Sequence, residues 1–269
     1  KNGLNTVKNR LLFAMSVGDA ITSLMYFLGT WMVPKDTPGV WMAAGTIGTC
    51  SAQGFLLQMF TAYQFYNAYL AIYFVLTILY NYRDEKNNSN ELLIRLEKGA
   101  HIFTFLFGLG TAVTILFLET FNSVLLWCWI ESVPPGSTNP KRGLPSKWWQ
   151  YGFWYIWMWS TFGIVVIGML VLVWTTKKRL KASLSARVAK RALLYLSAYF
   201  LTNVGNIVNQ TFTFSLGMPN SYPALLIITA TLPLQGFWNC LIYFHPKFQM
   251  YRKDRVRQTN TPTQAIETV

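Results

Sequence analysis

The chain has 269 residues, of which 52% are hydrophobic, 16% are aromatic and 12% are charged, and its formal net charge is +13. A soluble domain of ordinary composition carries about a quarter charged residues. The composition therefore excludes a typical soluble domain. A charge of +13 also raises the possibility of nucleic-acid binding, which the positions of the basic residues decide.

Apolar segments without Lys or Arg recur along the chain between short polar connections. Six of them have 20 residues or more: Leu11–Val33, Thr49–Leu79, Gly99–Leu118, Tyr151–Trp174, Ala192–Phe214 and Pro223–Phe244. A helix needs about 20 residues, at a rise of 1.5 Å each, to cross a bilayer. The ten-residue alternation of a transmembrane barrel is absent from the sequence. The sequence thus predicts an all-α membrane protein.

The basic residues are divided unequally between the two sides of this topology. Nineteen Lys and Arg residues precede the first segment, follow the last, or lie in the second and fourth connections, whereas four lie on the opposite side. This bias places the richer side, with both chain ends, in the cytosol. The positive charge then faces lipid headgroups and cytosolic partners rather than nucleic acid.

The opening residues, Lys1 to Asn5, have the composition of a short inner loop. We therefore expect a first transmembrane helix that is missing from this chain. Residues 1–245 are assigned to the transmembrane bundle, residues 246–258 to an amphipathic helix on the inner membrane surface, and residues 259–269 to a disordered cytosolic tail. The middle assignment follows from apolar residues at helical spacing among Lys and Arg.

Two of the three cysteines map to the outer side. Cys50 opens the second segment and Cys128 lies in the loop after the third, where an oxidising environment permits a disulfide. The alternative is two free thiols. Cys240 lies within the last segment and is interpreted as a small apolar residue.

Polar residues within the apolar segments are expected to face protein. Asp19 allows three interpretations: a protonated structural hydrogen-bonding group, a cation site, or part of a conformational switch. The second segment carries so many polar residues that we expect it to be central. Asn203, Asn206 and Asn209 form a stripe at spacing three, which is more often a contact between helices than a ligand site. In the last segment, Pro233 and Gly236 favour a kink or hinge.

Several of these features together resemble G-protein-coupled receptors. The run from Asn9 to Asp19 is similar to the start of the second receptor helix, with its membrane-embedded Asp. The resemblance also pairs Cys50 with Cys128 and gives Asn239 and Tyr243 the spacing of the Asn-Pro-x-x-Tyr motif. Within the superfamily, the segments around both cysteines and the final segment are similar to cyclic-AMP-receptor-like and fungal glucose-sensing receptors.

This chain also departs from that pattern. Cys240 replaces the Pro of the seventh-helix motif, and no Asp-Arg-Tyr triplet closes the third receptor helix. The resemblance implies a seven-helix bundle of which six helices are present. It also implies switch or hinge roles for Asp19, Pro233, Gly236, Asn239 and Tyr243.

The predicted function is that of a plasma-membrane receptor that senses an extracellular small molecule and activates a heterotrimeric G protein. A basic inner connection is the expected G-protein surface, with Lys177, Lys178, Arg179, Arg187, Lys190 and Arg191. A small-molecule transporter or channel is the alternative, and a membrane scaffold without a ligand also stays open. Catalytic motifs are absent, and we expect no enzyme activity, cofactor or metal.

The expected ligand pocket opens outward between the second, fourth, fifth and sixth segments. Its candidate residues are Gln53, Gln58, Trp154, Trp157, Asn206 and Asn209. This wall is rich in amide and indole groups and has no Lys or Arg within the membrane. The sequence therefore favours a neutral polar or modestly amphipathic ligand over cyclic AMP.

Overall fold

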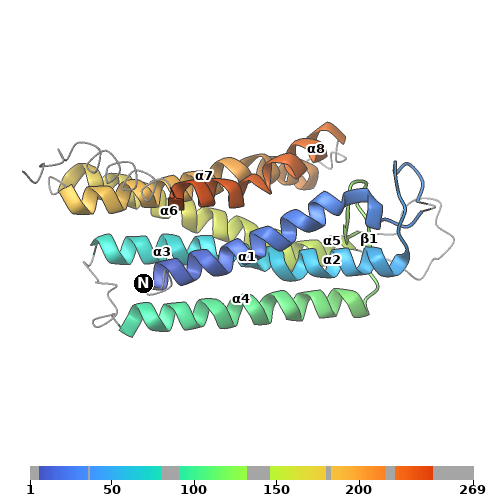
Figure 1. Ribbon diagram of the computed structural model, residues 1–269, viewed down its shortest axis with the longest axis horizontal. Coiled ribbons are helices and arrows are strands. Elements are labelled where there is room, and N and C mark those ends of the chain that lie inside the picture. The colour runs from blue at the N-terminus through green and yellow to red at the C-terminus, as the bar shows by residue number, and fades with distance from the viewer. Residues whose placement is uncertain are drawn as a thin grey trace, which may run out of the picture.

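The structure is a computed structural model that describes residues 6–35, 37–79, 91–131, 146–179, 183–215 and 222–244, and most of these residues are helical (Figure 1). The main α-helices are α1 (Val7–Leu28), α2 (Ile47–Thr61), α3 (Phe65–Leu79), α4 (Glu91–Phe117), α5 (Ser146–Gln150), α6 (Ile156–Arg179), α7 (Ser183–Ser215) and α8 (Tyr222–Thr231). Short 3₁₀ segments are η1 (Gly29–Met32) and η2 (Ala62–Gln64), η3 (Tyr151–Tyr155) is a π-helix, and the strands are β1 (Phe121–Ser123) and β2 (Cys128–Ile130). A further helix, helix 234–244, follows a turn at Leu232 and Pro233.

Five helices among the described residues are long and apolar enough to cross a membrane. They are Val7–Met32, Ile47–Leu79, Glu91–Phe117, Lys147–Thr175 and Leu226–Phe244. These helices confirm the prediction of a helical membrane protein. Five of the six predicted segments are recovered, and the sixth lies in α7. That helix is less apolar because it carries Asn203, Asn206 and Asn209.

The span formed by α2, η2 and α3 occupies the middle of the bundle. It contacts α1, α4, α6 and α7, and half of its apolar window is buried, more than in any of the other four spans. The prediction that the second segment is central is therefore confirmed. Figure 1 shows the long helices running side by side along the molecule, with α4 on one side and α6 to α8 on the other.

Two helices extend beyond the apolar segments predicted for them. α4 begins at Glu91, eight residues before the predicted start, and α7 begins at Ser183 rather than at Ala192. In α4, the added turns carry an exposed ion pair between Arg95 and Glu91 one turn apart. Apolar composition indicates only the part of a helix that lies in lipid. Charged turns that continue the helix outside the lipid are therefore not included in the predicted segments.

A disulfide joins Cys50 of α2 to Cys128 of β2, as predicted. Strands β1 and β2 form an antiparallel pair in which Ser123 is opposite Cys128. The bridge holds this hairpin against α2, and both sulfur-bearing residues are buried. We call this end of the bundle the outer end, following the predicted charge distribution.

Candidate functional site

The outer hairpin is fixed by Gln53, a fully buried residue of α2. Its Nε2 donates to the carbonyl oxygens of Met25 and Gly29 at 2.9 and 3.1 Å. Its Oε1 accepts from the backbone N–H of Cys128 at 2.8 Å. One side chain therefore joins the outer end of α1, α2 and β2 next to the disulfide.

Gln58, one helical turn and a half deeper in α2, has a similar set of contacts. Its Nε2 donates to Thr111 Oγ1 of α4 at 3.1 Å and to the carbonyl of Phe153 at 3.4 Å, and its Oε1 accepts from Trp129 Nε1 at 3.0 Å. Both glutamines were predicted as ligand contacts. Because their amide atoms are engaged within the fold, a ligand could reach them only by displacing these bonds.

The two predicted indole contacts lie on different sides of α6 and its preceding π-helix. Trp154 packs edge-on against Trp129 of the hairpin, with ring centroids 6.0 Å apart. Trp157 packs instead among Phe65, Phe103 and Phe107, and its Nε1 donates to the carbonyl of Gly152 at 2.9 Å. Trp154 is thus beside the outer loop, whereas Trp157 belongs to an aromatic cluster with α3 and α4.

The asparagine stripe of α7 includes two buried residues and one half-buried residue. Asn203 donates through Nδ2 to Gln235 Oε1 of helix 234–244 at 3.2 Å. Asn206 donates to the sulfur of Met158 in α6 at 3.5 Å. Asn209 is the half-buried one. Asn203 and Asn206 thus serve as contacts between helices, the role that their spacing favours.

Asp19 of α1 lies next to Gly236 of helix 234–244. A Cβ atom added at Gly236 would lie 3.1 Å from Asp19 Cβ and 3.5 Å from its Oδ2. Asn239, from the next turn, is buried and interacts with the Asp19 carboxylate. Oδ2 of Asp19 is buried without a hydrogen-bond partner among the described residues. The predicted switch residues Asp19, Gly236 and Asn239 are therefore brought together.

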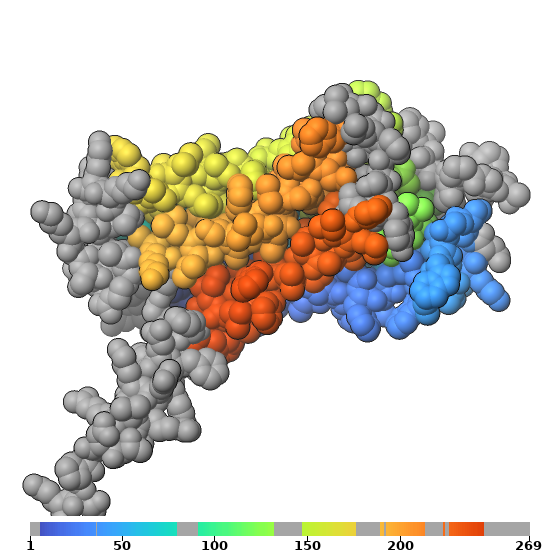
Figure 2. Space-filling view, turned by 90° about the horizontal axis from the view of Figure 1, so that it is seen from above, coloured from blue at the N-terminus to red at the C-terminus, as the bar shows by residue number. Residues whose placement is uncertain are grey.

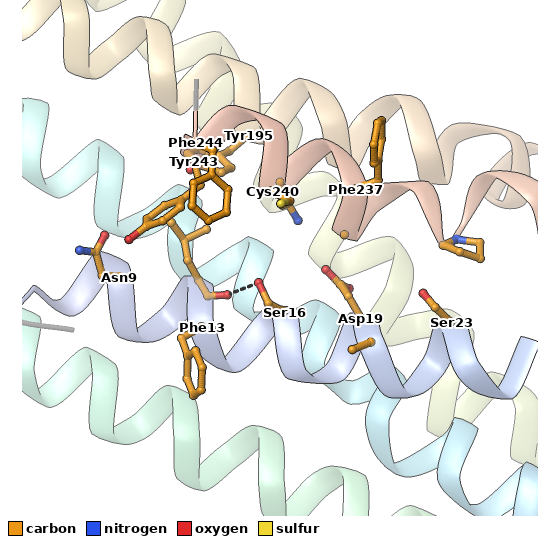
Figure 3. Close-up of a pocket in the computed structure, with 15 residues that line it drawn as sticks. Asn9, Phe13, Ser16, Asp19, Ser23, Tyr195, Phe237, Cys240, Tyr243 and Phe244 are labelled. Atoms are coloured by element: carbon orange, nitrogen blue, oxygen red, sulfur yellow. Dashed lines mark hydrogen bonds between the residues drawn. The ribbon is translucent and has the colours of Figure 1, made fainter. Parts of the chain in front are cut away.

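Three buried amide side chains, Gln235, Asn239 and Asn203, form a layer that extends from this contact to α7. Nε2 of Gln235 and Nδ2 of Asn239 each lie 4.0 Å from the sulfur of Met15 in α1, while Oε1 of Gln235 accepts from Asn203. Pro233 lies in the turn that separates α8 from helix 234–244, where the sequence predicts an interruption. Tyr243 packs at the margin of the main core, nearer the inner end. Figure 3 shows Asp19, Cys240 and Tyr243 along the facing sides of the two helices.

A polar cluster that joins the inner half of α1 and α4 to the start of α3 was not found from the sequence. Arg10 forms a two-pronged ion pair with Glu97, in which Nη2 lies 2.7 Å from Oε2. His101 Nε2 is 3.8 Å from Glu97 Oε1, and its Nδ1 is 2.8 Å from the hydroxyl of Tyr66. Glu97 and His101 are four residues apart, which places them on one helix face. That spacing was the available signal, but it does not identify partners on α1 and α3.

The predicted G-protein surface is described in part. Lys190 is exposed on α7. The side chains of Lys177, Lys178, Arg179, Arg187 and Arg191 lie outside the described residues, as do residues 246–269 with the predicted amphipathic helix and tail.

Comparison with protein-family models and with curated proteins finds no match. The geometry of the site therefore carries the functional argument.

Proposed function

We propose that the chain is the greater part of a seven-transmembrane-helix G-protein-coupled receptor of the plasma membrane. It senses an extracellular small molecule and activates a heterotrimeric G protein. The observation that carries the proposal is the buried amide pair Asn203–Gln235, which lies directly after the helix interruption at Leu232 and Pro233. A polar contact beside a broken helix is a bistable element of the kind a receptor needs.

The polar contacts support a fixed half of the bundle formed by α1 to α4. Gln53 joins α1, α2 and the hairpin, Gln58 joins α2 to α4, and the Arg10–Glu97 ion pair joins α1 to α4. Removing such bonds is costly because it leaves buried polar groups without partners. We infer that this half keeps its shape when a ligand binds.

The contacts of helix 234–244 support a moving half formed by that helix, α7 and α6. Helix 234–244 meets α1 through sulfur contacts of 4.0 Å, the Asp19–Gly236 approach and the interaction of Asn239 with the Asp19 carboxylate, and it meets α7 through a 3.2 Å amide bond. A ligand bound at the outer end of α6 and α7 would first change the contact between Asn203 of α7 and Gln235 of helix 234–244. Rotation of helix 234–244 about its break would then alter the inner surface of the bundle.

The ligand class is inferred from the groups of the predicted pocket. Trp154, which packs against Trp129 of the hairpin, and Asn209, which is half-buried on α7, are the candidate contacts, and Gln53 and Gln58 would have to exchange their present bonds. Indole and amide groups suit a neutral polar or modestly amphipathic molecule. A strongly anionic nucleotide would need Lys141, Arg142 or Lys147, of which Lys147 lies in α5.

The proposal is tested by nucleotide exchange on purified heterotrimeric G proteins, with the full-length protein in lipid nanodiscs. We expect the wild type to accelerate exchange above the G protein alone. Gln235→Leu should raise the basal rate about fivefold, because loss of a buried hydrogen bond of about 1 kcal/mol shifts the resting equilibrium by that factor. Ser160→Ala is the matched control, since Ser160 is exposed and donates only along its own helix, to the carbonyl of Ile156.

Joint neutralisation of the six basic residues of the predicted G-protein surface should abolish the acceleration while surface expression persists. Unchanged exchange in that variant would mean that these charges set topology alone. If no heterotrimer responds to wild type or to Gln235→Leu, and proteoliposomes instead take up small solutes, the receptor proposal is wrong and the transporter alternative is favoured.

A further inference from the structure

The outer connection between η1 and α2, residues 33–46 and described except for residue 36, forms a closed loop that we call the 33–46 loop. Backbone hydrogen bonds close its base. The N–H of Gly45 donates to the carbonyl of Val33 at 2.8 Å, and the N–H of Lys35 donates to the carbonyl of Gly45 at 3.1 Å. A Cβ atom added at Gly45 would lie 2.4 Å from the carbonyl oxygen of Met32, so this close approach requires glycine. The base of the loop is therefore fixed.

One side of the 33–46 loop packs against the disulfide. Val33 is fully buried beside Cys50 and Cys128, and Val40 and Ala43 pack against the same cluster. A loop that is tied at its base and along one side cannot turn all of its side chains inward. The two residues between Val40 and Ala43 are the ones that point away from the bundle.

Those two residues, Trp41 and Met42, form the tip of the loop. Trp41 is 83% exposed and Met42 is 49% exposed, and no other large hydrophobic residue among those described is more exposed than Trp41. Met42 has a φ of 61°, in the left-handed region that residues other than glycine rarely adopt. Such backbone strain persists only where the surrounding structure fixes it, and it is concentrated at functional positions. The tip is thus a held conformation that presents an indole ring and a thioether.

The depth of the tip in the membrane follows from the packing of its two neighbours. The second span begins at Ile47, so Cys50 lies three residues inside it. Val40 and Ala43 reach the disulfide cluster of Cys50, which brings the loop back to the level of the first turn of that span. Figure 2 shows this part of the chain, in light blue, beside the outer end of α1. The headgroup layer begins at this level and is about 5–8 Å thick on each side of the hydrocarbon core.

The chemistry of the tip suits lipid better than a charged partner. Residues 37–46 include no charged residue. Trp is enriched at membrane–water interfaces, because its ring is apolar while its N–H can reach a polar group. Phe27 and Trp31, at the outer end of the first span, are 74% and 49% exposed and pack edge-on with ring centroids 6.1 Å apart. Uncharged aromatic surface is therefore present on α1, on η1 and on the loop.

We propose that the tip, Trp41 and Met42, inserts into the headgroup layer of the outer leaflet and that its partner is a zwitterionic phospholipid. The contact holds the disulfide end of the bundle at a fixed depth, because the 33–46 loop packs directly on Cys50 and Cys128. The proposal requires the membrane-spanning bundle and the sidedness predicted from its charges, but not receptor activity.

Spin-label accessibility in phosphatidylcholine nanodiscs tests this contact in the full-length protein. A nitroxide is attached at Met42→Cys in a Cys240→Ser background, which keeps Trp41 and the disulfide intact. Oxygen concentrates in lipid, whereas a polar nickel chelate stays in water. We expect the label to collide preferentially with oxygen and to be protected from the chelate.

Two reference labels in the same background calibrate the result. A label at Leu106→Cys reports lipid, because Leu106 is 62% exposed on the apolar part of α4. A label at Arg95→Cys reports water, because Arg95 is exposed in the charged extension of the same helix. Protection of the label at position 42 should resemble that at Leu106 and differ clearly from that at Arg95.

A variant pair identifies the residue that makes the contact. Trp41→Ser should shift the label at position 42 toward the water reference. Trp148→Ser is the matched control, because Trp148 is 77% exposed on α5, outside the 33–46 loop, and the label should keep its preference for oxygen. Adding phosphatidylglycerol should change neither result, since the tip is uncharged. A contact that appears only with this anionic lipid would be made by Lys35 and would overturn the role of Trp41.

Two further results would overturn the proposal. Chelate accessibility at position 42 equal to that at Arg95 would place the tip in water, and protection from both reagents would show that protein covers it. The measurement requires neither ligand nor G protein. A tip in water with intact nucleotide exchange would therefore refute the lipid contact alone, and a tip in lipid without exchange would refute the receptor function alone.

Discussion

Replacing Gln53 by Leu tests how firmly the outer hairpin is held. The change keeps the side-chain volume nearly constant, so the cavity contribution is small. It removes three hydrogen bonds and leaves the buried N–H of Cys128 without its acceptor. At about 0.5–1.5 kcal/mol net for each bond, the expected loss is about 2–4 kcal/mol. For a chain of this size that corresponds to a fall in Tm of roughly 5–15 °C.

The measurement is thermal unfolding in detergent micelles, followed by tryptophan fluorescence, with the disulfide intact throughout. Ser160→Ala serves as control and should stay within about 0.5 kcal/mol of wild type, because Ser160 is exposed and bonds only along its own helix. A Gln53→Leu protein as stable as the control would refute the anchoring role. Its amide would then be available to a ligand, as the sequence predicted.

Three further predictions concern other contacts. Glu97→Arg should lower the Tm and impair insertion, and adding Arg10→Glu should restore most of the loss, because the ion pair re-forms with its charges exchanged. A thermal-shift series measures both variants. A double variant as unstable as Glu97→Arg would argue against direct pairing. Gly18→Val should destabilise strongly, because an added Cβ would lie 2.5 Å from Cβ of Tyr63, whereas Gly110→Val should be nearly neutral. Peptide mapping without reductant should recover the disulfide-linked pair, and reduction should lower the Tm, since the bridge closes a loop of 78 residues.

The fold was predictable where a single physical property decides it. Apolar length located the spans because lipid must be matched along the whole helix. Topology placed Cys50 and Cys128 on the same side, and the structure joins them. The polar content of the second segment predicted its central position, because so many amide and hydroxyl groups require protein neighbours.

The site was predictable only in part, because a polar residue within a span indicates that a hydrogen-bond partner is required but does not show which residue that partner is. Gln53 and Gln58 were placed correctly near the outer loop, but their bonds go to Cys128 and Trp129 rather than to an open pocket. The partner of Arg10 is 87 residues away, and no local pattern links the two. Such pairings are set by the rotation of each helix about its axis, which hydrophobicity fixes only coarsely.

The π-helix at Tyr151–Tyr155 sets how α5 is turned relative to α6. The backbone N–H of Ile156 bonds the carbonyl of Tyr151, five residues back, so this span holds one residue more than an α-helix of the same length. Deleting that residue would turn α5 by about 100° relative to α6. Gln150 would then leave the carbonyl of Ile130, which it now reaches at 2.5 Å. A related chain lacking the extra residue would align here with a one-residue gap inside a transmembrane span.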